Sequence, residues 1–220
     1  MLNFQNIYPD IFGPYLKDEE ASFEIHNLGQ RINEFYKLTY RNSYKEIDCR
    51  SDRIILRMEE YDRDFLNANS QIKIYLNILE KLKDTPLFGK VRLSLMAIWA
   101  FYKLDTHLSE ITNLFKDYYL SSDPVIYGQS LSDVMLAVEK DVNDDLHKFE
   151  IGPYTPDKDF FRFNLEKNNP ENDYLKEENG LFLFYQVVTV KDTVSHSLFK
   201  GIYKDIISEI EKLLAPWNKK

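Results

Sequence analysis

Carboxylates and one imidazole are concentrated between residues 141 and 147, in the order Asp-Val-Asn-Asp-Asp-Leu-His. Residues three or four apart share one face of a helix, so this spacing would bring Asp141, Asp144 and His147 together. Asp192 and His196 form a second pair at helical spacing. Such side chains on two facing helices suit a divalent metal. The sequence therefore allows a metal-dependent enzyme that uses these five residues.

The same segment also fits an acidic, solvent-exposed helix face, with Val142 and Leu146 turned toward a core. The chain has only four histidines and no Glu-x-x-His pair. Gly89 and Lys90 lack the glycine-rich lead of a phosphate-binding loop, and no nucleophilic-serine motif is present. We therefore expect no cofactor, and the metal-dependent enzyme is an alternative to the binding function described below.

Arginines form a second cluster. Six of the eight arginines lie within residues 31–63, although the chain otherwise prefers lysine. Arg50, Arg53 and Arg57 would share one helix face, and guanidinium groups bind planar anions in a bidentate way. This spacing allows a sensor of phosphate-bearing ligands, as a weaker alternative. Nearly as many acids as bases occupy the same stretch, so a network of ion pairs is the simpler interpretation.

The third feature is an acidic stretch rich in aromatic residues, from Asp133 to Glu178. It contains 13 acids and six bases, which account for most of the chain's net charge of −8. Aromatic anchors inside a charged rim are typical of protein-binding surfaces. The alternative is a solvated loop whose aromatic side chains fold back onto the core. The candidate partner-binding residues are Tyr154, Asp157, Asp159, Phe161, Glu166 and Asp173.

Net charge and composition narrow the range of partners. A net charge of −8 disfavours nucleic acid and anionic membrane surfaces, and it favours a basic protein. The single cysteine, Cys49, excludes an internal disulfide and indicates a reducing compartment. The N-terminal residues lack the basic start of a signal peptide, and no apolar run approaches the roughly 20 residues that span a bilayer. We therefore expect a cytoplasmic protein.

Helical spacing dominates the apolar pattern, because apolar residues recur every three or four positions through much of the chain. We predict an all-α fold, an irregular bundle of six to eight helices in one domain over residues 1–220. An irregular arm (1–17) and a long acidic loop (151–179) interrupt it. The stretch from Pro86 to Leu104 is predicted as the central buried helix, because it is apolar nearly all round from Leu93 onward. The other helices are expected at 18–40, 51–84 (one helix, or two that break near 67–69), 106–120, 130–146 and 194–213.

Two segments leave room for a small β element. Residues 181–190 are rich in β-branched and aromatic side chains, which favour a strand. They lie between helical stretches, however, and have no obvious strand partner, so a helix is preferred. A short strand is allowed at 160–165 within the acidic loop. If both are strands, the fold is α+β with a small sheet.

These observations favour a non-enzymatic binding protein of the inhibitor, antitoxin or immunity type. Its acidic, aromatic segment would engage a basic protein partner. An acidic surface speeds encounter with a cationic groove, and buried aromatic side chains slow release.

Overall fold

The structure, a computed structural model, describes residues 12–13, 17, 19, 21–27, 35–40, 45–50, 54–59, 77–78, 80–81, 94–120, 125–126, 129–130, 133–163, 173, 175–189 and 196–219. The chain divides into two compact units, residues 1–91 and 92–220. Each unit is described by itself. The prediction of a single domain over 1–220 stays a prediction.

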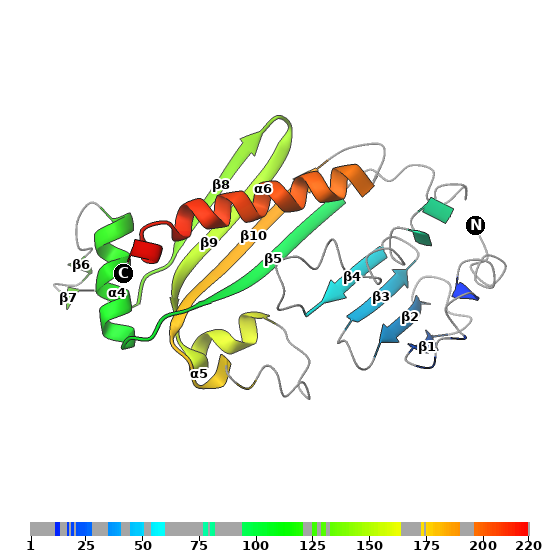
Figure 1. The fold of residues 1–220 in the computed structure, drawn as a ribbon, viewed down its shortest axis with the longest axis horizontal. Coiled ribbons are helices and arrows are strands. Elements are labelled where there is room, and N and C mark those ends of the chain that lie inside the picture. Colours follow the sequence, from blue (N-terminus) through cyan, green and yellow to red (C-terminus); the bar gives the residue numbers. More distant parts are fainter. Residues whose placement is uncertain are drawn as a thin grey trace. The chain divides into compact units, whose positions relative to one another are not determined.

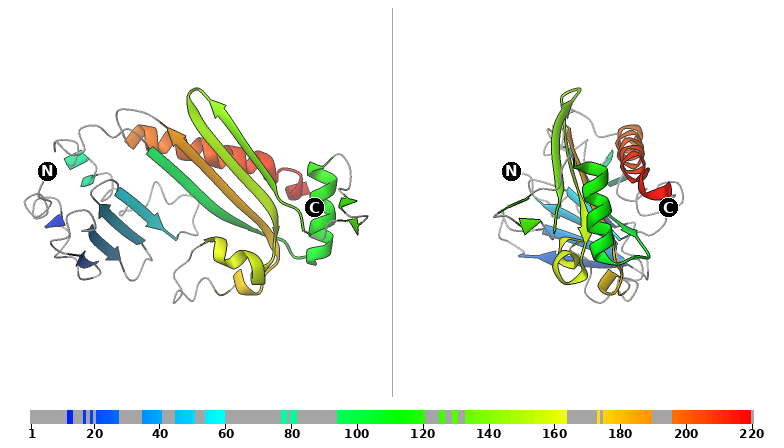
Figure 2. Two further views of the ribbon diagram at one scale, coloured as in Figure 1. Left: turned by 180° about the vertical axis from the view of Figure 1, so that it is seen from behind. Right: turned by 90° about the vertical axis from the view of Figure 1, so that its left-hand side faces the viewer.

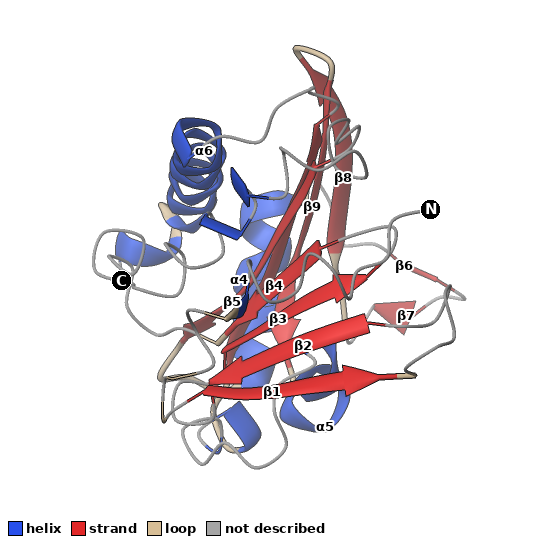
Figure 3. Ribbon diagram, turned by 90° about the vertical axis from the view of Figure 1, so that its right-hand side faces the viewer, coloured by secondary structure: helices blue, strands red, loops and turns tan. Residues whose placement is uncertain are grey.

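The first unit is built on a four-stranded antiparallel sheet whose strands pair in chain order (Figure 3). Tyr36, Leu38 and Ile47 are buried on one face, and Phe12 packs against Tyr36 and Phe23. The charged side chains alternate with these apolar ones, as a half-buried strand requires. The strands are β1 (Ala21–His26), β2 (Phe35–Tyr40), β3 (Lys45–Arg50) and β4 (Ile54–Met58).

The second unit contains a longer antiparallel sheet in the order β5-β10-β9-β8. β10 is central and pairs with β5 on one side and β9 on the other. A separate two-stranded pair, β6 (Val125–Ile126) and β7 (Gln129–Ser130), follows the first helix of this unit. The strands of the large sheet are β5 (Ser94–Lys103), β8 (Leu136–Val142), β9 (Asp145–Tyr154) and β10 (Gly180–Thr189).

Two helices cover one face of this sheet. α6 (His196–Leu214) runs across it, and α4 (Leu108–Tyr119) packs beside β9 (Figure 1). Their buried side chains meet alternate residues of β9 and β10 in a single core. The core side chains of the two helices and of the short helix η3 (Trp217–Lys219) are Ile111, Phe115, Ile206, Ile210, Leu214 and Trp217.

A tight turn joins β8 to β9. Val142 pairs with Asp145, so only Asn143 and Asp144 form the loop. Both have positive φ, at 51° and 68°. Two consecutive residues with positive φ define the hairpin turn that matches the natural twist of antiparallel strands, and Asn and Asp tolerate this conformation. The range 130–146, expected as a helix, therefore contains the end of β7, all of β8, this turn and the first residues of β9.

The prediction of an all-α bundle is wrong, because both units are organised around antiparallel sheets. The expected central helix at 86–104 contains the edge strand β5, and residues 181–189 of the segment expected as a helix belong to the central strand β10. The strand partners that the sequence did not reveal are β5 and β9, which are distant along the chain. The helices expected at 106–120 and 194–213 are confirmed as α4 and α6.

Three other predictions need correction. The expected helix at 18–40 contains β1 and β2, and the expected helix at 51–84 contains β4. The expected loop at 151–179 begins with the end of β9. It continues as a short α5 helix (Pro156–Asp159) and a 3-10 helix η1 (Phe160–Phe163), where a strand was allowed. Most of the N-terminal arm lies outside the described residues.

Candidate functional site

Strand alternation gives the large sheet two faces of different character. Residues paired across antiparallel strands share a face, so the register assigns each side chain. One face packs on α4 and α6. The view from behind shows the strands in front of α6 (Figure 2). The opposite face is called the open face below. By this register it consists of Leu95, Ala97, Trp99, Phe101, Lys103, Ala137, Glu139, Asp141, Leu146, Lys148, Glu150, Gly152, Tyr154, Gly180, Phe182, Phe184, Gln186 and Val188.

The open face is apolar along β5 and β10. Leu95 is 58% exposed and Trp99 is 47% exposed, and both come from the edge strand β5. The Trp99 ring contacts that of Phe184 on β10, with centroids 5.2 Å apart. Leu146 extends the apolar surface onto β9 and is also exposed. Contiguous exposed apolar side chains on a folded domain are a mark of interaction sites.

The other side of the open face is acidic. The register places Glu139 and Asp141 of β8 there, and both are exposed. Lys148 and Glu150 of β9 form an ion pair at 3.0 Å. The hydrogen bond to Glu150, helped by the charges of Glu150 and Glu139, raises the pKa of Lys148 above its ordinary value. Three carboxylates against one ammonium leave a net negative charge beside the apolar stripe.

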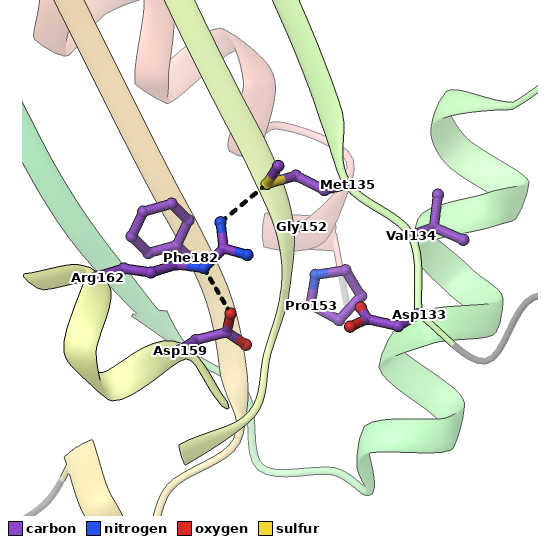
Figure 4. Close-up of a pocket in the computed structure, with 8 residues that line it drawn as sticks. All are labelled: Asp133, Val134, Met135, Gly152, Pro153, Asp159, Arg162 and Phe182. Carbon is purple, nitrogen blue, oxygen red and sulfur yellow. Dashed lines mark hydrogen bonds and ion pairs between the residues drawn. The ribbon is translucent and has the colours of Figure 1, made fainter. Parts of the chain in front are cut away.

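A small hollow lies at the end of the open face that carries Gly152 and Phe182, which is called its foot below. Here α5 and η1 fold back toward the sheet (Figure 4). The volume of the hollow is about 200 Å³. Arg162 donates from Nε to Asp159 at 2.8 Å and lies 5.4 Å from the centroid of Phe182. Asp159 also accepts a hydrogen bond from the backbone N–H of Thr155 at 2.8 Å. The remaining lining residues are Asp133, Val134, Met135, Gly152 and Pro153.

The polar side chains that line the hollow hold α5 and η1 in place. Both oxygens of the Asp159 carboxylate have partners, and Arg162 Nη1 donates to the Met135 sulfur at 3.2 Å. Phe163 of η1 meets Phe182 and Tyr154 edge to face. The foot of the open face is thus closed by η1, and the upper part, around Trp99, carries the exposed apolar surface.

The structure separates the six expected partner-binding residues. Tyr154 is fully buried, and its hydroxyl donates to the Leu175 carbonyl at 2.7 Å. Asp159 is only 6% exposed, so both residues serve the fold. Phe161 is 80% exposed, and Asp157 and Asp173 are also exposed. Glu166 lies outside the described residues. A partner-binding role for the three exposed residues stays a prediction.

The arginines of the proposed anion site have acidic partners. Arg50 of β3 contacts Asp48 at 3.2 Å and stacks over Phe35 at 4.7 Å. Arg57 of β4 contacts Glu46 at 3.4 Å, and Lys37 contacts the same carboxylate at 2.7 Å. Arg53 lies outside the described residues. The pairs around Arg50 and Arg57 fit the ion-pair network that the sequence offered as the simpler interpretation.

The proposed metal ligands do not share a face. Asp141 is on the open face, Asp144 is in the hairpin turn, and His147 is on the helix-covered face. His147 Nδ1 lies 3.1 Å from the Tyr185 hydroxyl. Asp192 and the side chain of His196 lie outside the described residues. Among the part of the chain that the structure describes, no group of three His, Cys, Asp or Glu residues is placed to hold a metal ion.

Sequence reasoning missed Leu95 and Trp99 as surface residues, because it assigned them to a buried helix. The signal that could have identified the strand is the uncharged run from Leu93 to Tyr102, which charged residues bound on both sides and which is short for the buried helix of a bundle. Within the described residues, no helix has the length and hydrophobicity needed to cross a membrane. Comparisons with protein-family models, curated proteins and solved structures found no match to this chain.

Proposed function

We propose that this chain is a non-enzymatic binding protein whose open face engages a basic protein partner. The observation that carries this proposal is the exposed pair Leu95 and Trp99, which lies on the same sheet face as Glu139 and Asp141. An apolar centre beside a charged rim is the usual arrangement of a protein-binding surface. The partner would present an apolar patch flanked by lysine or arginine.

Trp99 is the expected anchor of this surface. An aromatic side chain of this size buries about 150–250 Å² when covered, and roughly half of Trp99 is still exposed. Covering the exposed half removes on the order of 100 Å² of apolar surface, or about 2.5 kcal/mol before the costs of association. That magnitude is typical of a hot-spot residue.

The distribution of charge supports a basic partner. Residues 92–220 contain 21 acids and 15 bases, and residues 1–91 contain 15 acids and 13 bases. The unit that carries the open face therefore holds most of the net negative charge. A field of this sign accelerates encounter with a cationic groove. An enzyme that acts on a polyanion has such a groove, and an acidic inhibitor of that enzyme would place carboxylates where phosphates bind.

The test is affinity capture at low salt from the cells that express the protein, followed by kinetics with the purified partner. Trp99→Ser should mainly raise the dissociation rate, because it removes the anchor. Glu139→Gln combined with Asp141→Asn should mainly lower the association rate and flatten its salt dependence. Val138→Ser is the matched control, since it removes an exposed apolar side chain of β8 on the other face of the same sheet. If the open-face variants bind like the parent, or if Val138→Ser weakens binding as much as they do, the proposal is wrong.

A further inference from the structure

β5 is an edge strand with unusually little protection. It is ten residues long, it pairs only with β10 among the described strands, and it has no charged residue before Lys103. It also contains neither proline nor glycine. Soluble proteins normally protect such edges with charges, prolines or bulges, because an uncovered edge is a template for pairing.

The side chains of β5 are self-complementary about Ala97. In an antiparallel pair centred on Ala97, Leu95 lies opposite Trp99 of the partner subunit, and the same contact forms again on the other side of the two-fold axis. The small side chain of Ala97 leaves space at the centre. The two exposed apolar residues of the strand, Leu95 and Trp99, would therefore contact each other sideways across the seam, and the outer surface of both would stay open on the shared face.

Charge does not oppose this pairing. The acidic strand β8 is the opposite edge of the sheet, three strand spacings or roughly 14 Å from β5. In the paired sheet, the two β8 strands would be about 33 Å apart, well beyond the screening length of about 8 Å at physiological salt. The seam itself is uncharged from Ser94 to Tyr102.

We propose that two copies of this chain join their β5 strands antiparallel, centred on Ala97, into one continuous eight-stranded sheet. The two open faces then lie on the same side of that sheet. The apolar stripes meet in the middle, and an acidic hairpin flanks each outer edge. The proposal goes beyond the binding function above, because the dimer forms without any other partner.

Sedimentation of the full chain over a concentration series from the micromolar range upward tests this directly. We expect a reversible monomer–dimer equilibrium. Ala97→Lys should give a monomer, because two ammonium groups would face each other at the centre of the seam. Ala137→Lys is the matched control on the same face of the other edge strand, and it should still dimerise. A monomer at every concentration, or an Ala97→Lys protein that dimerises like the parent, overturns the proposal.

The register has its own test. In a Cys49→Ser background, Ala97→Cys places two thiols directly opposite each other across the two-fold axis, and mild oxidation should give a covalent dimer. Ala137→Cys in the same background should stay monomeric on a denaturing gel. Thermal unfolding of each variant shows that it is folded. A dimer whose Ala97→Cys variant does not cross-link would overturn the proposed seam. Both experiments use the protein alone, so their outcome is independent of partner capture.

Discussion

The hydroxyl of Tyr119 links the end of α4 to the C-terminal end of α6. It donates to the Leu213 carbonyl at 2.6 Å and accepts from Trp217 Nε1 at 3.0 Å. Trp217 is only 5% exposed, so its N–H has little access to water. Replacing Tyr119 with phenylalanine keeps the ring contact with Phe115 but leaves both polar groups without this partner.

The expected cost of Tyr119→Phe is about 2 kcal/mol of unfolding free energy. A buried polar group that loses its partner costs roughly 1–3 kcal/mol, and the Leu213 carbonyl, at the end of a helix, is better able to find water. The neighbouring Tyr118 is the control. It is exposed and its ring meets Trp217 edge to face at 5.2 Å, a contact that phenylalanine can keep. Tyr118→Phe should change stability by less than about 0.5 kcal/mol.

Urea unfolding followed by tryptophan fluorescence measures both variants. The two tryptophans, Trp99 and Trp217, lie in the second unit, so the signal reports that unit alone. Burial raises the pKa of the Tyr119 hydroxyl above its ordinary value of about 10. The stabilisation that the neutral Tyr119 hydroxyl gives the folded state is therefore complete below pH 10, and it is lost as pH rises through the raised folded-state pKa. The difference in unfolding free energy between the parent protein and Tyr119→Phe should become smaller in that alkaline range. Equal stability of Tyr119→Phe and Tyr118→Phe would refute the reasoning.

Two further predictions concern packing in the second unit, and thermal unfolding measures both. Gly180→Ala should destabilise by about 1–3 kcal/mol or more, because a Cβ there would lie 2.2 Å from the Tyr102 carbonyl oxygen on β5. Gly201→Ala, where the new Cβ meets nothing within 4 Å, should instead stabilise α6 by roughly 0.5–1 kcal/mol. Equal effects of the two substitutions would contradict the close approach of β5 to Gly180 and the open space at Gly201. Ile206→Ala removes a fully buried side chain between α6 and the sheet and should cost about 2–5 kcal/mol, and a loss under 1 kcal/mol would show that α6 does not pack there.

The two helices that the sequence predicted correctly have one apolar face each. Apolar residues recur at helical spacing in each helix, Ile111 being one of them in α4 and Ile206 one of them in α6. Polar residues fill the rest of each helix surface. Local periodicity is sufficient for such helices, because their apolar face is set within one segment.

The central strand β10 shows no such periodicity. Residues 181–183 are all buried, because α6 covers one face and η1 closes the foot of the other. A continuous apolar run of this length fits a buried strand or a buried helix equally well. Its partners, β5 and β9, are remote in sequence, so their pairing was not visible locally. β5 has an apolar run for another reason. Its side chains on the open face include Leu95 and Trp99, where an ordinary half-buried strand would be polar.

β8 carries no alternation that would distinguish a strand from a helix. Its apolar residues Leu136, Ala137 and Val138 are followed by the charged residues Glu139, Lys140 and Asp141, and most of the strand is exposed. The concentration of acids in this region was predictable from composition. Which acids share a surface depended on the register of β8 against β9, and that follows from the two-residue turn at Asn143 and Asp144.

Acrylamide quenching of tryptophan fluorescence tests most directly the central claim that the open face is the surface that binds the partner. Trp217 is buried and Trp99 is about half exposed, so the quencher-accessible emission of the free protein comes mainly from Trp99. When the captured partner saturates the protein, we predict that this accessible fraction disappears and that the emission shifts to the blue. Saturated binding with Trp99 still as accessible to acrylamide as in the free protein would contradict the assignment of the open face as the binding surface.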